Sequence, residues 1–114
     1  MAGILPIAYH NGKVYFLFGR ETKDVKTRQS GLWSDFGGTR EKGESLFYTA
    51  VREGYEETDG VLGNQKKIEL LIENYQIDVI NQGKYKIYMV MVPYNKALPK
   101  KFRMQYKKAK KKDM

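Results

Sequence analysis

The sequence predicts a mixed α+β domain in which one helix packs on a β-sheet. Three observations predict it: an Asn-Gly pair between two apolar runs near the N-terminus, an amphipathic stretch over residues 45–58, and a largely apolar run over 84–93. With 114 residues, the chain is long enough to bury one modest core, so a single domain is expected.

The first element is predicted to be a β-hairpin formed by residues 4–9 and 13–18. Asn11-Gly12 lies between these runs, and Asn-Gly between apolar, strand-forming residues is the strongest short-range signal of a hairpin. Residues 20–31 are polar and are expected to form a loop, followed by a short extended piece over 32–36.

A helix is predicted over residues 45–58, because apolar and small residues recur on one side of its helical wheel. Ala50 and Gly54 lie on that side, and their small size indicates close packing against a sheet. Gly60 is expected to end the helix in a left-handed conformation.

The C-terminal half is predicted to contain strands at 67–80 and 84–93, with a turn between them. Beyond residue 98 only a weak amphipathic helix is expected. Residues 99–114 hold eight of the 21 lysines and arginines and one of the 13 acidic residues, so most of the net charge of +8 lies there. The predicted organisation is therefore a domain at 1–98 and a basic C-terminal tail at 99–114. The tail is interpreted either as a site for polyanions such as RNA or as a solvated end.

Composition limits the kinds of site that the chain can build. Cysteine is absent, which excludes disulfides and thiolate zinc sites and fits a reducing, cytoplasmic location. His10 is the only histidine, so a metal site must use oxygen ligands, which favours Mg²⁺ or Mn²⁺. No apolar run is long enough to span a bilayer, and no membrane partner is expected.

Three glutamates stand within one turn of the predicted helix. Glu53, Glu56 and Glu57 are spaced i, i+3 and i+4, which places them on one face. Like charges so placed repel by a few tenths of a kcal/mol, roughly, for each exposed pair. A divalent metal would convert this repulsion into a binding site. A helix with three solvated glutamates is the alternative.

The three glutamates belong to a set of six residues at fixed spacings: Gly38, Glu44, Arg52, Glu53, Glu56 and Glu57. The pattern resembles the Nudix box, G-x5-E-x7-R-E-U-x-E-E-x-G-U, where U is aliphatic. The resemblance implies a Nudix-like mixed sheet with the box helix packed on it, in a minimal or truncated version. Three positions depart from the box: Gly54, Asp59 and Gly60 stand where an aliphatic residue, a glycine and an aliphatic residue are usual.

The resemblance also implies roles for these residues. The implied metal ligands are Glu53, Glu56, Glu57 and a backbone carbonyl of the glycine pair, Gly38 or Gly37. Glu53 is alternatively the residue that orients the attacking water. Arg52 is expected to support catalysis by pairing with Glu44 or Glu56, and Glu44 is expected to give structural support.

The implied function is that of a Nudix hydrolase dependent on Mg²⁺ or Mn²⁺. It would cleave a diphosphate linkage in a nucleoside triphosphate, a dinucleoside polyphosphate, a diphosphoinositol phosphate or an mRNA cap. Arg20 and Arg40 are candidate contacts for the substrate phosphates, with an ordinary surface role as the alternative. A nucleotide- or RNA-binding module that has a Nudix fold and a basic tail but no catalysis is the alternative function.

Two expectations concern the wider setting of the chain. The lead-in at residues 33–38, WSDFGG, resembles a variant found in large DNA viruses and their eukaryotic hosts, so a viral origin would place the protein in the host cytoplasm. Exposed strand edges in so short a chain lead us to expect a homodimer.

Overall fold

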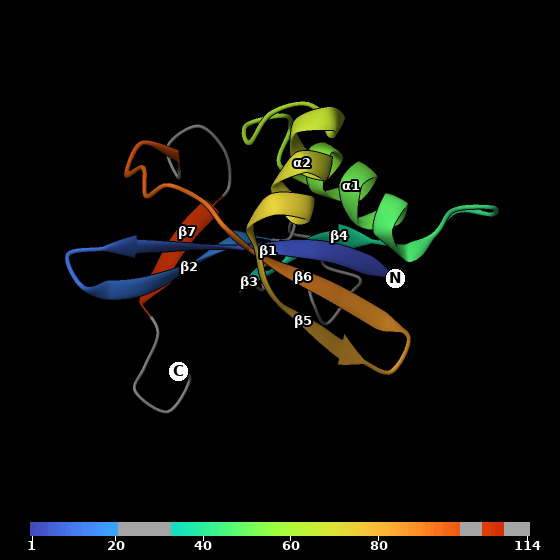
Figure 1. Ribbon diagram of the computed structural model, residues 1–114, viewed down its shortest axis with the longest axis horizontal. Helices are drawn as coiled ribbons and strands as arrows, with labels where there is room; N and C mark the ends of the chain where they lie inside the picture. Colours follow the sequence, from blue (N-terminus) through green and yellow to red (C-terminus); the bar gives the residue numbers. More distant parts are fainter. Residues whose placement is uncertain (21–32, 99–103, 109–114) are drawn as a thin grey trace, which may run out of the picture.

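A computed structural model describes residues 1–20, 33–98 and 104–108 (Figure 1). In these residues one seven-stranded sheet carries two helices on the same side. The elements in chain order are β1 (Ala2–His10), β2 (Lys13–Arg20), β3 (Trp33–Ser34), β4 (Phe36–Gly38), α1 (Leu46–Glu57), α2 (Gln65–Tyr75), β5 (Gln76–Gln82), β6 (Tyr85–Met91) and β7 (Met104–Lys108).

The sheet is mixed, with β1 at its centre. The strand order is β3-β2-β1-β6-β5, with β4 also pairing with β1 and β7 with β2. β1 runs parallel to β6 and antiparallel to β2 and β4. This confirms the predicted α+β class, a mixed sheet with the box helix packed on it.

The predicted hairpin joins β1 to β2. Asn11 and Gly12 have φ of 51° and 74°, and a type I′ turn requires positive φ at both central residues. The turn sets the register that pairs His10 with Lys13 and Ile7 with Phe16.

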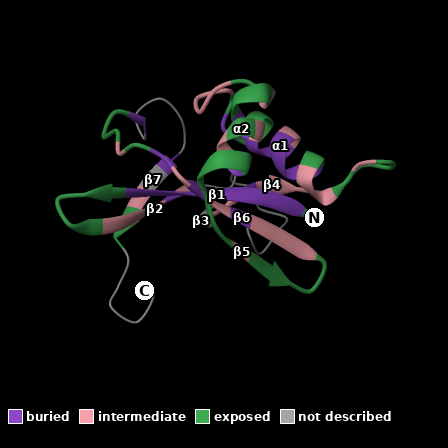
Figure 2. Cartoon of the chain, viewed as in Figure 1, coloured by how far each residue is buried: buried purple, intermediate pink, exposed green. Residues whose placement is uncertain are grey.

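The core lies where the helices meet the sheet, and the buried residues concentrate there (Figure 2). Ser45 caps α1, because its hydroxyl oxygen accepts a hydrogen bond from the N–H of Tyr48 at 3.1 Å. Ala50 and Val51 of α1 are buried against this core, as the predicted helix face requires.

Two predictions for the C-terminal half are wrong. Residues 65–75 form helix α2, so only the part of the predicted strand 67–80 from Gln76 onward is a strand, β5. Asn64 begins this helix by accepting the N–H of Lys67 at 2.9 Å, and Ile68 and Ile72 bury one face of it. Beyond residue 98, the described residues 104–108 form strand β7 rather than a helix.

β7 places part of the basic tail in the sheet, where it pairs with residues 15–19 of β2. The division of the chain at residue 98 stays a prediction. None of the helices among the described residues is long and apolar enough to cross a membrane.

Candidate functional site

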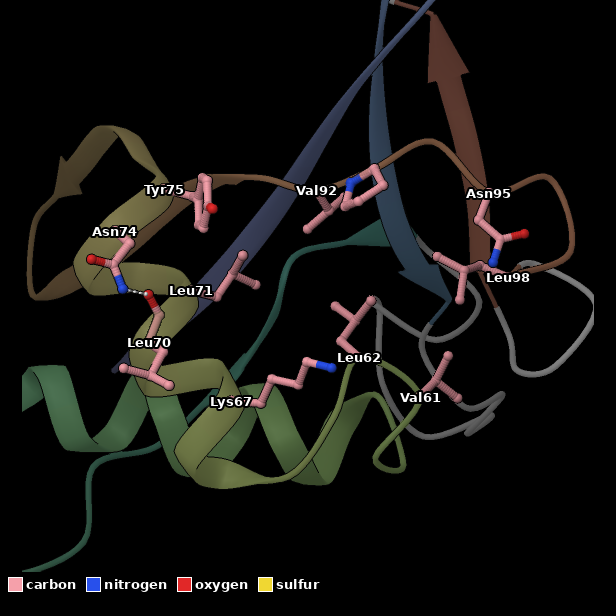
Figure 3. A pocket seen from close by; sticks show the side chains of 11 residues that line it. Val61, Leu62, Lys67, Leu70, Leu71, Asn74, Tyr75, Val92, Asn95 and Leu98 are labelled. Atoms are coloured by element: carbon pink, nitrogen blue, oxygen red, sulfur yellow. Dashed lines mark hydrogen bonds between the residues drawn. The ribbon is translucent and has the colours of Figure 1, made fainter.

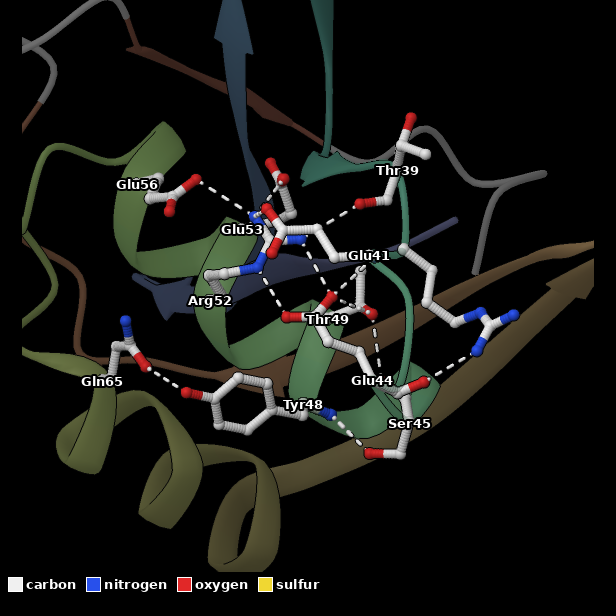
Figure 4. A network of polar contacts seen from close by, with 11 residues as sticks. Thr39, Glu41, Glu44, Ser45, Tyr48, Thr49, Arg52, Glu53, Glu56 and Gln65 are labelled. Atoms are coloured by element: carbon white, nitrogen blue, oxygen red, sulfur yellow. Dashed lines mark hydrogen bonds and ion pairs between the residues drawn. The ribbon is translucent and has the colours of Figure 1, made fainter.

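Arg52 ties the segment after β4 to α1 through all of its N–H groups (Figure 4). Its Nε donates to Glu44 Oε2 at 2.6 Å, and Nη2 donates to Glu44 Oε1 and to the carbonyl of Thr39, each at 3.0 Å. Nη1 donates to Glu53 Oε1 at 2.7 Å and to Glu56 Oε2 at 3.2 Å. A guanidinium carries five N–H donors in a fixed fork, so every donor of Arg52 has a partner.

Glu44 anchors this segment. Besides Arg52, its Oε1 accepts the backbone N–H of Glu41 and the hydroxyl of Thr49, both at 2.9 Å. The hydrogen bonds from Arg52, and next the one from Glu41, lower the pKa of Glu44 from 4.5 to about 2. The contact with Glu44, which outweighs the opposing effect of burial, raises the pKa of Arg52. Both groups therefore stay charged at neutral pH, and the ion pair holds the segment against the helix.

Glu53 faces the backbone of the glycine pair in β4. The residue is 8% exposed, and a Cβ built on Gly38 would lie 2.5 Å from its Oε2. Only glycine allows the carboxylate to approach the strand so closely. Glu56 is half exposed, and its carboxylate meets that of Glu53 at Nη1 of Arg52. Two of the three predicted carboxylate ligands therefore converge on Arg52, with Glu53 also beside Gly38, while Glu57 lies exposed near the end of α1.

Within the part of the chain that the structure describes, no three acidic or histidine side chains are gathered closely enough to hold a metal ion. The positive charge between Glu53 and Glu56 is instead the guanidinium of Arg52. It offsets the repulsion that the helical spacing of these carboxylates creates.

The two arginines predicted to meet substrate phosphates have different surroundings. Arg40 is exposed, and its Nη1 donates to the backbone carbonyl of Glu44 at 2.9 Å. Arg20 ends β2 opposite Trp33 of β3, and its side chain lies outside the described part of the chain. The structure therefore places Arg40 beside the Arg52 network.

A second carboxylate beside the glycine pair was not predicted as a site residue. The hydroxyl of Tyr85 donates a hydrogen bond to Asp35 Oδ2 at 2.9 Å. A Cβ on Gly37 would lie 2.6 Å from the Tyr85 hydroxyl and 2.8 Å from Asp35 Oδ2. Successive residues of a strand face opposite sides, so Gly37 contacts this pair while Gly38 contacts Glu53. In the sequence, Asp35 and Gly37 stand on either side of Phe36, which is buried in the structure. This alternation is the signal that Asp35 and Gly37 share one face of the strand.

No protein-family model matches the chain. Over 58 residues, half of the chain, it is 43% identical to an uncharacterized protein of Acanthamoeba polyphaga mimivirus, and the match covers 18% of that protein. The relative comes from a large DNA virus, and such viruses and their eukaryotic hosts are the expected sources of the variant at residues 33–38.

Solved structures are similar over nearly the whole chain. RenU, a Nudix hydrolase from M. smegmatis, aligns with a TM-score of 0.58 and 17% identity over 94% of this chain and 68% of its own. A C. elegans Ap4A hydrolase in a binary complex aligns with a TM-score of 0.57 and 16% identity over 98% and 80%. The fold is Nudix-like. At these identities the likeness establishes the fold alone.

The departures from the Nudix box have physical counterparts in this Nudix-like fold. A Cβ at Gly54 would lie 3.1 Å from Ile4 Cδ1 and 3.4 Å from Ile68 Cγ2. Side chains from β1 and α2 therefore fill the space that the usual aliphatic residue would need. Asp59, where glycine is usual, has a φ of 52°, and Gly60 follows with 73°. The exit of the helix keeps the left-handed conformation that glycine favours, and Gly60 adopts it as predicted.

The donor groups at this site suit a hard divalent cation. They are carboxylate oxygens on α1 and the backbone of Gly38, with no sulfur or imidazole among them, and such sets suit Mg²⁺ or Mn²⁺. Four carboxylates lie within 4 Å of the single charge of Arg52, those of Glu41, Glu44, Glu53 and Glu56. Among these five groups the negative charge is in excess, which favours the approach of cations.

Proposed function

We propose that this chain is a Nudix-type pyrophosphohydrolase that requires a divalent cation and cleaves a diphosphate linkage in a nucleoside diphosphate derivative. The observation that carries the proposal is the network of five hydrogen bonds from Arg52, which holds the segment after β4 against the face of α1 that carries the glutamates. The box spacing and the Nudix-like fold support it.

In this proposal Glu53, Glu56, Glu57 and the backbone carbonyl of Gly38 are the groups that would hold Mg²⁺ or Mn²⁺. When bound, the cation would polarise the phosphate oxygens and lower the pKa of a water. Glu53 is buried and held by Arg52, so it is the carboxylate best fixed to orient the attacking water. Glu44 already has four hydrogen-bond donors and serves as an anchor for the segment.

Dinucleoside polyphosphates lead the substrate candidates, because the C. elegans neighbour is an Ap4A hydrolase. Nucleoside triphosphates, diphosphoinositol phosphates and capped RNA are the others. All carry several phosphates, which suits a chain whose net charge of +8 is concentrated in its basic tail.

A screen of these four substrate classes with Mg²⁺ and with Mn²⁺, reading products by mass, tests the proposal. Glu56→Gln and Glu57→Gln should each lower turnover by about 100-fold or more, since even outer-shell partners of a metal are worth roughly 10–100-fold. Glu73→Gln, at an exposed position of α2, is the matched control and should keep wild-type turnover.

Thermal unfolding of each variant separates a loss of chemistry from a loss of fold. Full turnover by both folded variants would contradict the proposal. Binding of a nucleotide without any product would instead support a binding module that lacks catalysis.

A further inference from the structure

A groove between α2 and the segment that follows β6 shares no residue with the Arg52 network (Figure 3). Its volume is about 620 Å³, within the usual range for ligand pockets of roughly 300–1,000 Å³. Its walls are mainly aliphatic, and the side chains of Leu62, Leu71, Val92 and Leu98 surround the space. A smaller cavity of about 420 Å³ extends it toward aromatic residues, Tyr9 and Tyr94.

The rim of the groove exposes large apolar side chains. Leu70 of α2 is 43% exposed and Tyr75 is 60% exposed, whereas Val92 and Leu98 are buried beneath the opening. A bound apolar molecule would remove rim surface from water, at about 25 cal/mol for each Å² buried. Exposed apolar surface around a concave site is typical of ligand binding.

Lys67 is the one charged residue among the described residues that line the two cavities. Gly63, with a φ of 113°, gives its stem room, because a Cβ there would lie 2.7 Å from Lys67 Cδ. The ammonium extends toward Leu62 (Figure 3). No described carboxylate pairs with it, whereas the neighbouring Lys66 lies 4.0 Å from Glu69. Among the described residues, the groove therefore presents a single positive charge on an apolar surface.

We infer that this groove binds an amphipathic organic anion. The apolar, partly aromatic body of the ligand lies between α2 and residues 92–98, and its single carboxylate or sulfonate pairs with Lys67. Because one ammonium balances one negative charge, the ligand differs in class from the polyphosphate substrates proposed for the Arg52 network. The site is thus a second one, independent of hydrolysis.

Fluorescence titration of the full chain with anilinonaphthalene sulfonate tests this inference. The probe should bind with saturation, and decanoate should displace it while decylammonium, of equal chain length, should not. Lys67→Met should weaken binding about fivefold, the upper end for an exposed ion pair. Lys66→Met removes an adjacent charge from outside the groove and should leave binding unchanged.

Methyl NMR spectra give a second reading on the unmodified protein. Addition of decanoate should shift the signals of Leu71, Val92 and Leu98. Unchanged affinity in Lys67→Met, displacement by decylammonium, or no saturable binding would each overturn the inference. A ligand-free dimer that shields these methyl groups would also overturn it, because a second copy would then be the occupant.

Discussion

At the scale of single residues, Arg52 is the group on which the candidate active site depends. Its five hydrogen bonds join two segments and three glutamates, and lysine offers three donors from a single point. Arg52→Lys should therefore lower the free energy of unfolding by about 2 kcal/mol, as loss of hydrogen bonds between charged groups does. Urea denaturation measures the change.

Arg40→Lys is the matched control for that experiment. Arg40 is exposed and has one hydrogen bond to the backbone of Glu44, so its replacement should cost less than about 0.5 kcal/mol. Equal stability of Arg52→Lys and the wild type would show that the network does not hold the two segments together.

The carboxylate of Glu44 should make the free energy of unfolding depend on pH in the acidic range. Its pKa is about 2 in the folded chain, against an ordinary value of 4.5. Its contribution is therefore complete above pH 4.5 and is lost as the pH falls toward 2. Wild-type urea midpoints should drop through this window, and Glu44→Gln should start lower at neutral pH and drop less. Parallel curves for the two proteins would contradict the assignment, and Glu73→Gln should follow the wild type.

At the scale of elements, the exit of α1 offers a test of backbone conformation. Asp59 has a φ of 52°, which costs an L-residue roughly 1–2 kcal/mol and costs glycine little. Asp59→Gly should thus raise the free energy of unfolding by about 0.5–1 kcal/mol. Asp59→Ala should lower it, since alanine has a Cβ and no side-chain oxygen to tolerate this conformation. Chemical denaturation of the two variants measures these changes. An equal gain in the free energy of unfolding from alanine and from glycine would contradict the explanation.

Helix α2 lies where the sequence predicts the first part of a strand at 67–80. Residues 68–72, IELLI, are consistent with either a strand or a short helix, because a brief apolar run has no clear period. Asn64, whose side chain caps the helix, and the i, i+4 pair Ile68 and Ile72 were the available signals. The contact of Ile68 with Gly54 favours the helix, and that contact depends on tertiary packing.

At the scale of the whole molecule, the sequence predicts contacts between residues that are close in the chain, and it does not predict contacts between residues that are far apart in it. Glu44, Arg52 and Glu56 lie within 12 residues of one another in the chain, and the resemblance implies a pairing of Arg52 with Glu44 or Glu56. In the structure Arg52 donates to both. Asp35 and Tyr85 are 50 residues apart in the sequence, and strands β2 and β7, which pair with each other, are also far apart in it. No local period encodes such contacts. RNA binding by the tail, a homodimer and a cytoplasmic location stay predictions.

The central position of β1 has a consequence for how the protein is made. β1 is synthesised well before its parallel neighbour β6, which begins only at Tyr85. The glycine pair of β4 is paired with β1, so its backbone gains the support of the full sheet centre only after β6 has been synthesised. We expect the arrangement of Glu53 beside the glycine pair to form late in folding, because pairing between segments far apart in the sequence is slow. Until then the nascent chain would carry the residues of the site without its geometry.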